Sequence, residues 1–177
     1  MATVDGATVD GGSRLRGRIE LIFGPMFSGK TTELIRRLRR YMLAKHDCLI
    51  VKYASDAKHE IDHITTHDSQ CQAALLATTL HDLKSLASIY SVIAIDEGHF
   101  FPDIVSFAEE MAQRDKVILI AALDGTSERK PFGHVLQLMP LAENVIKLTA
   151  ICMHCFRDAA FTTSIETDDT TGRKHIY

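Results

Sequence analysis

The sequence predicts an α/β fold in which a mainly parallel sheet is covered by helices on both faces. Four apolar runs rich in β-branched residues recur along the chain, and longer segments with helical periodicity separate them. Nearly continuous apolar strands are typical of parallel sheets, because both faces of such a sheet are buried. A glycine-rich loop that directly follows the first apolar run also favours this fold class. The expected strands are residues 18–23, 48–53, 91–95 and 116–123.

Composition restricts the class of protein before any motif is considered. A chain of 177 residues with 46% hydrophobic and 24% charged residues fits one globular domain with a small appendage. No apolar run approaches the roughly 20 residues that span a bilayer. The net charge of −3 gives no general attraction to nucleic acid or to an anionic membrane, so we expect neither as a partner. Residues 1–17 contain a repeated small, acidic segment and are expected to be a flexible tail.

The first expected helix follows the glycine-rich loop. Leu34, Leu38, Tyr41 and Met42 recur with helical spacing and predict an apolar stripe that packs on the sheet. Four arginines lie off this stripe, and we favour a solvated helix face over a phosphate-binding patch for them. These are Arg36, Arg37, Arg39 and Arg40.

A second helix is predicted after the third strand. Pro102 suits a first helical position, and Asp103 follows it in the first turn. The helix is expected to end near Gln113. Its apolar face is expected to consist of Ile104, Phe107, Ala108 and Met111.

The loop after the first strand has the spacing of a phosphate-binding P-loop. Residues 24–31 satisfy the pattern G-x-x-x-x-G-K-[ST], between an expected strand and an expected helix, as that loop requires. Gly24 and Gly29 allow backbone N–H groups to converge on phosphate oxygens, and the helix N-terminus adds its positive dipole. Lys30 would neutralise the β- and γ-phosphates, and the Thr31 hydroxyl would bind Mg²⁺.

Two acids end the third strand, where a P-loop protein needs a carboxylate for the same metal ion. Asp96 is the expected Mg²⁺ partner. Paired acids after four apolar residues repel each other unless a cation lies between them, so packing alone explains them poorly. Glu97, one residue further on, is the candidate general base for an attacking hydroxyl.

Three other interpretations fit parts of the sequence. Residues 59–63 match the zinc-protease pattern H-E-x-x-H, although we expect a polar loop there rather than the helix that such a site needs. Residues 96–99 match the D-E-x-H pattern of nucleic-acid-dependent ATPases, although those motors need two lobes. A non-enzymatic zinc-binding module is the third alternative. Cys152 and Cys155 have the spacing of a zinc knuckle, which indicates a reducing, cytoplasmic setting.

Taken together, these motifs resemble those of the type II, zinc-containing thymidine kinases. The likeness runs from about residue 18 to residue 162 and is carried by segments 24–34, 95–104, 121–126, 129–132 and 147–155. The resemblance implies a RecA-like kinase domain that transfers the γ-phosphate of ATP to the 5′-hydroxyl of thymidine, giving dTMP. It places Glu97 on the family's catalytic base. It also implies Mg²⁺, a structural Zn²⁺, a cytoplasmic homotetramer and feedback inhibition by dTTP.

The same resemblance assigns two groups of binding residues. Those expected at the ATP site are Gly24, Pro25, Met26, Phe27, Ser28, Gly29, Lys30, Thr31, Asp56, Lys58, Asp96, Gly98 and His99. Those expected around thymidine are Met26, Phe100, Leu123, Ser127, Phe132, Thr162 and Tyr177.

The chain departs from the family pattern at several positions. Lys58 stands where arginine is usual, Ser127 where an aromatic residue is common, and His99 where glutamine is common. A second C-x-x-C pair, which would complete a four-sulfur zinc site with Cys152 and Cys155, is absent from the sequence. We therefore expect a kinase domain over 18–148 and an incomplete zinc and lasso domain over 149–177.

Overall fold

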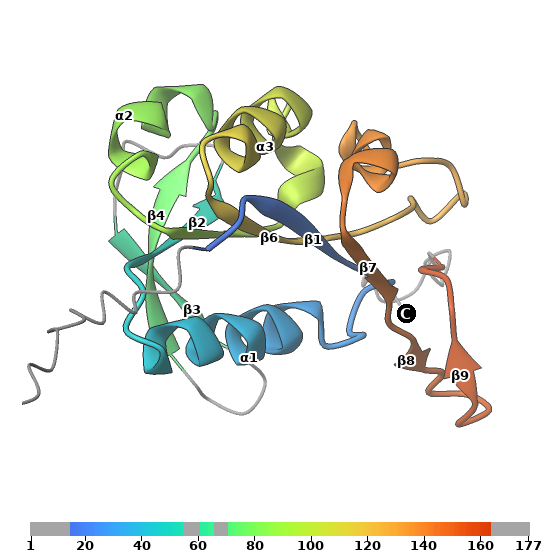
Figure 1. Ribbon diagram of the computed structural model, residues 1–177. Coiled ribbons are helices and arrows are strands. Elements are labelled where there is room, and N and C mark those ends of the chain that lie inside the picture. The colour runs from blue at the N-terminus through green and yellow to red at the C-terminus, as the bar shows by residue number, and fades with distance from the viewer. Residues whose placement is uncertain (1–14, 55–60, 66–70, 164–177) are drawn as a thin grey trace, which may run out of the picture.

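The computed structural model describes residues 15–54, 61–65 and 71–163, which form a main sheet flanked by helices and a small two-stranded sheet (Figure 1). The main sheet has seven strands in the order β3-β4-β2-β5-β6-β1-β7. Every pairing is parallel except that of β3 with β4. The strands are β1 (Arg18–Phe23), β2 (Cys48–Tyr53), β3 (Ile61–Thr65), β4 (Cys71–Ala77), β5 (Val92–Asp96), β6 (Val117–Ala122) and β7 (Asn144–Lys147).

The four strands predicted from apolar runs are confirmed as β1, β2, β5 and β6. β5 and β6 are buried along their whole length, as expected for central strands covered on both faces. The sequence pattern did not reveal β3, β4 and β7, because it selects apolar runs rich in β-branched residues. Edge strand β7 is short and largely exposed, β3 has only two apolar residues, and the apolar run of β4 consists of alanine and leucine.

The expectation of a loop at the H-E-x-x-H pattern is wrong for its second half. Residues Ile61–Thr65 form strand β3, which pairs antiparallel with β4. His63 therefore lies in a strand, whereas a zinc-protease site places both histidines on one helix. His59 lies outside the described residues.

Two helices cover the two faces of the sheet (Figure 1). Helix α1 (Lys30–Leu43) buries Leu34, Ile35 and Leu38 against β5, β6 and β1. Met42, expected on this stripe, is instead exposed, as are residues 43–45, so the buried stripe ends before the last turn of the helix. No helix in the part of the chain that the structure describes is long and apolar enough to span a membrane.

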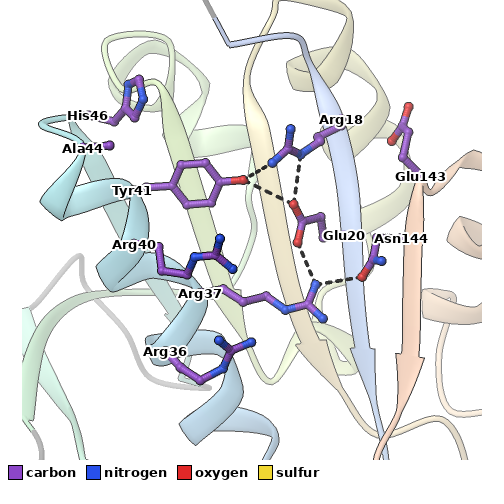
Figure 2. A pocket seen from close by; sticks show the side chains of 10 residues that line it. All are labelled: Arg18, Glu20, Arg36, Arg37, Arg40, Tyr41, Ala44, His46, Glu143 and Asn144. Atoms are coloured by element: carbon purple, nitrogen blue, oxygen red, sulfur yellow. Dashed lines mark hydrogen bonds and ion pairs between the residues drawn. The ribbon is translucent and has the colours of Figure 1, made fainter. Parts of the chain in front are cut away.

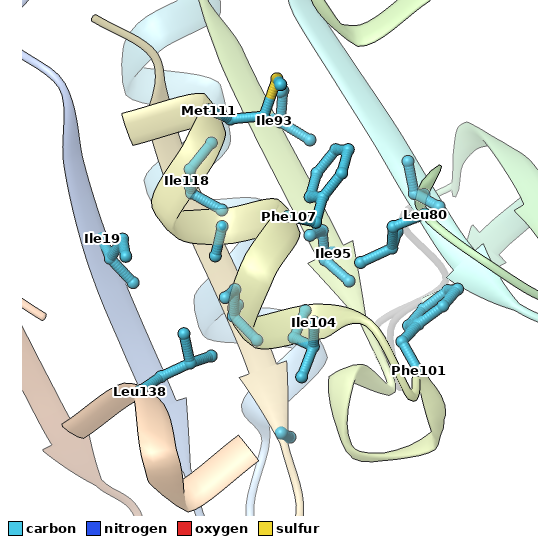
Figure 3. Close-up of a cluster of buried hydrophobic side chains, with 14 of the residues drawn as sticks. Ile19, Leu80, Ile93, Ile95, Phe101, Ile104, Phe107, Met111, Ile118 and Leu138 are labelled. Atoms are coloured by element: carbon cyan, nitrogen blue, oxygen red, sulfur yellow. The ribbon is translucent and has the colours of Figure 1, made fainter. Parts of the chain in front are cut away.

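Helix α3 (Ile104–Gln113) packs on the opposite face and buries its four predicted apolar residues (Figure 3). The helix ends where the sequence predicts, but it begins at Ile104, two residues after Pro102. Asp103 occupies the N-cap position. Shorter turns complete the fold, namely η1 (His81–Leu83), α2 (Lys84–Ala87), η2 (Gly98–Phe100) and η3 (Val135–Leu141).

An ion-pair network joins β1 to α1 beside an open hollow of about 630 Å³ (Figure 2). Glu20 of β1 accepts hydrogen bonds from Arg18 at 2.9 Å and from Arg37 at 2.6 Å. Arg37 also bonds Glu33 and Asn144, and its side chain is only 12% exposed. The expected solvated arginine face is therefore wrong for Arg37, which ties the helix to the sheet.

The carboxylate of Asp103 connects the start of α3 to the segment after β4. It accepts hydrogen bonds from the backbone N–H groups of Leu80 and His81, and it lies 2.6 Å from Nδ1 of His81. Although burial opposes the effect, these hydrogen bonds hold the pKa of Asp103 below its ordinary value near 3.8. The ionised carboxylate therefore stabilises the folded chain.

Asp103→Asn is expected to lower the free energy of unfolding at pH 7 by about 2 kcal/mol, the usual value of hydrogen bonds to a charged group. Because the folded pKa is depressed, the stabilisation is complete above the unfolded pKa and is lost as the pH falls through the folded pKa. Denaturant unfolding of both proteins between pH 7 and pH 3 should show their difference shrinking below about pH 4. Glu109→Gln, an exposed change in the same helix, is the control. A difference that is constant with pH would contradict the assignment.

Candidate active site

The candidate site lies at the edge of the sheet where β1, β5 and β6 end. These strands are parallel, so their carboxyl ends meet, with Phe23 beside Ala122 and Ile95 beside Ile120. The loop of residues 24–29 leaves β1 and enters α1. Because α1 packs back across β5 and β6, the start of this helix is close to the end of β5.

The loop has the tight conformation that its two glycines permit. Gly29, the N-cap of α1, has φ of 82°, a left-handed conformation that favours glycine. A Cβ on Gly24 would lie 2.4 Å from Oγ of Ser28 and 2.9 Å from a backbone oxygen, so no larger residue fits there. Pro25 O accepts hydrogen bonds from Ser28 Oγ at 2.9 Å and from Lys30 Nζ at 2.6 Å.

Thr31 and Asp96 meet across the site. The Thr31 hydroxyl lies 3.1 Å from both carboxylate oxygens of Asp96. Asp96 is only 4% exposed, and its burial raises its pKa to about 6, with repulsion from Glu97 adding to the effect. A hydroxyl and a buried carboxylate with raised pKa form an oxygen donor pair that suits a hard divalent cation such as Mg²⁺.

Lys30 places a positively charged side chain near the carboxylates of this site. Its burial lowers its pKa, while the nearby carboxylates of Glu97, Asp96 and Asp124 oppose that shift. Glu97 has a left-handed backbone with φ of 56°, uncommon for a non-glycine residue and often found at functional sites. Its side chain is 40% exposed. Glu97 is therefore the accessible acid of the pair, and Asp96 is the buried one.

Aromatic rings form one wall beside these acids. Phe100 stacks on Tyr53 with ring centroids 5.1 Å apart and meets Phe132 edge-on at 5.5 Å. The ring of His99 lies between Phe100 and Phe132, at 4.1 and 4.5 Å from their centroids. Leu123, at the end of β6, donates its backbone N–H to Nδ1 of His99 at 3.1 Å. The wall is therefore apolar, with one buried imidazole behind it.

The P-loop is also connected to the segment after the cysteine pair. Met26 N–H donates to the buried hydroxyl of Thr162 at 3.0 Å. Near Thr162 is a pocket of about 230 Å³ that Asp124, Arg129, Lys147 and Phe161 also line. The tertiary structure thus brings together two residues that are 136 positions apart in sequence.

Two of the residues singled out in the sequence face solvent. Ser127 is exposed, and Phe27 is 61% exposed. Asp56, Lys58 and Tyr177 lie outside the described residues.

Sequence reasoning missed Asp124 and Tyr53. Asp124 lies near Lys30 and forms an ion pair with Lys147 at 2.5 Å. Both residues sit where an apolar strand ends, Tyr53 at the end of β2 and Asp124 two residues past β6. The rule that selected Asp96, an acid at the end of an apolar strand, could have selected Asp124, whereas nothing in the local pattern singles out Tyr53.

The cysteine pair lies in a small hairpin of β8 (Ala150–Ile151) and β9 (Asp158–Ala159). Backbone hydrogen bonds from Cys155 and His154 hold the pKa of the Cys152 thiol below its usual value. Such bonds favour the thiolate, the form that binds metals. Within the described residues, no group of three or more histidine, cysteine or acidic residues is placed to hold a metal ion.

Comparison with known proteins agrees with the resemblance noted from the motifs. A family model described as "Thymidine kinase" matches residues 17–174. The chain is 53% identical over 156 residues to cytosolic thymidine kinase of Homo sapiens, covering 88% of this chain and 66% of the relative, so it spans about two thirds of that protein's length.

Viral relatives are matched over more of their length. The chain is 53% identical over 146 residues to thymidine kinase of Myxoma virus, covering 82% of each chain. It is 52% identical over 152 residues to that of Variola virus, covering 86% of this chain and 85% of the relative. A family model that matches most of the chain and identities above 50% lead to one conclusion: the chain belongs to the thymidine kinase family.

Proposed function

We propose that this protein is a thymidine kinase, which transfers the γ-phosphate of ATP to the 5′-hydroxyl of thymidine. The observation that carries the proposal is the contact between Thr31 of the P-loop and the buried Asp96, with Glu97 beside it. This arrangement unites a phosphate-binding loop, a metal-binding oxygen pair and an accessible base. Family membership supplies the substrate class.

The proposed chemistry relies on positioning and charge, because phosphoryl transfer passes through a loose transition state. Backbone N–H groups of the loop and the start of α1 bind the phosphates. Lys30 stabilises the charge on the transferred group. Glu97 accepts the proton of the 5′-hydroxyl and holds that oxygen in line with the phosphorus.

Mg²⁺ fits the residues that would hold it. The Thr31 hydroxyl lies 3.1 Å from the Asp96 carboxylate, so oxygen donors from two elements are already adjacent, and burial together with repulsion from Glu97 raises the pKa of Asp96. When bound, Mg²⁺ neutralises charge on the phosphates. The two side chains would orient that ion relative to Lys30.

The nucleoside pocket is proposed to lie between the aromatic wall and the Met26–Thr162 contact. Phe100, Phe132 and Leu123 offer an apolar surface for the thymine ring and its methyl group. Ser127 is exposed and is smaller than the aromatic residue that is common at this position in the family. We therefore propose that the entrance of the nucleoside pocket is more open in this protein. We expect weaker discrimination among substituents at the 5-position of the base than a closed aromatic pocket would give.

The remaining family properties are proposed on the resemblance alone. They are a RecA-like kinase domain over 18–148, a zinc and lasso domain over 149–177, a homotetramer, a cytoplasmic location and feedback inhibition by dTTP. Cys152 and Cys155 supply two of the four donors that a structural zinc site needs. The cellular relatives carry the word cytosolic in their names.

A phosphate-transfer assay with γ-labelled ATP tests the function. Thymidine and the other deoxynucleosides are offered separately, with and without single-stranded DNA. Labelled dTMP as the main product, independent of DNA, is the expected result. ATP hydrolysis that depends on DNA would favour the D-E-x-H ATPase, and no transfer to any nucleoside would overturn the proposal.

A further inference from the structure

His99 is a buried titratable group to which the mechanism above gives no role. It lies in the η2 turn two residues after Glu97, and its side chain has no solvent exposure. Polar side-chain atoms that are buried almost always have a hydrogen-bond partner. Nε2 of His99 has none among the residues that the structure describes, so this nitrogen requires an explanation.

The hydrogen bond to the other ring nitrogen fixes the tautomer. Leu123 donates its backbone N–H to Nδ1 at 3.1 Å, so Nδ1 is an acceptor and carries no proton. Burial, together with the positive charge of Lys30, lowers the pKa of His99 to about 4. The ring is therefore neutral at physiological pH, and its single proton is on Nε2.

The candidate base lies near this nitrogen. Nε2 of His99 lies 3.5 Å from Oε2 of Glu97, slightly beyond a good hydrogen bond. The ring cannot move far, because Phe100, Phe132 and the Leu123 N–H hold it. The Glu97 side chain is 40% exposed and can rotate. Catalytic hydrogen bonds of this kind are often long in the free enzyme and shorten in the complex.

We propose that His99 is a positioning residue, whose Nε2–H donates to one carboxylate oxygen of Glu97 and leaves the other oxygen free for the substrate hydroxyl. The inference rests on the proposed function. The hydrogen bonds of His99 connect Glu97 to the nucleoside pocket. The backbone N–H of Leu123 sets the tautomer of His99, and the side chain of Leu123 borders the proposed pocket. Glutamine can replace both interactions, since its amide oxygen accepts from Leu123 and its amide N–H donates to Glu97.

The test compares two substitutions at position 99 in the full chain. His99→Gln should keep kcat within about 3-fold of the original protein. His99→Leu, which can neither accept nor donate, should lower kcat about 10-fold while KM for thymidine changes less than about 2-fold. Phe107→Leu removes a buried ring from the core on the α3 face and serves as the stability control, with kcat unchanged. His99→Leu with unchanged kcat, or His99→Gln as slow as His99→Leu, would overturn the inference.

A measurement without turnover separates this inference from the proposed function. In ¹⁵N-histidine-labelled protein, the signals that disappear in His99→Gln belong to His99. Their shifts should report a protonated Nε2 and an unprotonated Nδ1 at pH 7. The opposite tautomer or a charged ring would refute the inference even if the protein phosphorylates thymidine. Absence of transfer with the expected tautomer would instead count against the kinase activity.

Discussion

Glu97→Gln is expected to lower kcat for thymidine phosphorylation by about 100-fold or more, the usual contribution of a general base. Glutamine has nearly the same shape but cannot accept a proton. The Kd values for ATP and thymidine should change less than about 3-fold, because the hydroxyl can still hydrogen-bond to the amide oxygen. Single-turnover transfer of labelled phosphate and equilibrium binding of each substrate measure the two effects separately.

The control for this experiment is Glu128→Gln. Glu128 is 70% exposed on the loop after β6, so its replacement removes the same charge without touching the proposed base. Its kcat should equal that of the original protein. If Glu97→Gln retained near-normal turnover, Glu97 would not be the base, and Asp96 and Asp124 would be the other acids near Lys30 to test.

Asp96→Asn is expected to have opposite effects on activity and stability. Loss of the buried carboxylate should lower kcat by about 100- to 1000-fold at saturating ATP, because a bound metal ion contributes several kcal/mol of charge stabilisation. Without metal, the same change should stabilise the fold. A pKa raised from 3.8 to about 6 corresponds to roughly 3 kcal/mol of unfavourable burial that asparagine does not suffer.

Thermal unfolding with and without Mg²⁺ checks both halves of this prediction. In EDTA at neutral pH, Asp96→Asn should unfold at a higher temperature than the original protein. Added Mg²⁺ should raise the Tm of the original protein, because a ligand of the native state stabilises it, and should have little effect on the variant. Asp47→Asn, at an exposed position, is the matched control. Lower stability of Asp96→Asn in EDTA would show that the carboxylate is structurally required.

Most of the fold could be predicted because its central part is locally encoded. β5 and β6 are runs of apolar residues without interruption, and α1 and α3 show clear helical spacing. The sequence-based prediction failed at the periphery of the sheet, where tertiary packing determines the secondary structure and the exposure of each residue. β3 and β7 become strands by pairing with a neighbour, and Met42 becomes exposed at the solvent-facing end of α1.

The sequence by itself determined the chemistry of the P-loop, since the spacing of Gly24, Gly29, Lys30 and Thr31 specifies a backbone conformation and its ligand class. It also placed two acids at the end of β5. Only the tertiary structure decided their different environments, because burial depends on which elements cover each side chain. Asp96 meets Thr31 of α1 and is buried, whereas Glu97 reaches solvent beside the imidazole of His99. The backbone of Leu123, just after β6, orients that imidazole. No local pattern contains that contact, since its partners are 24 residues apart.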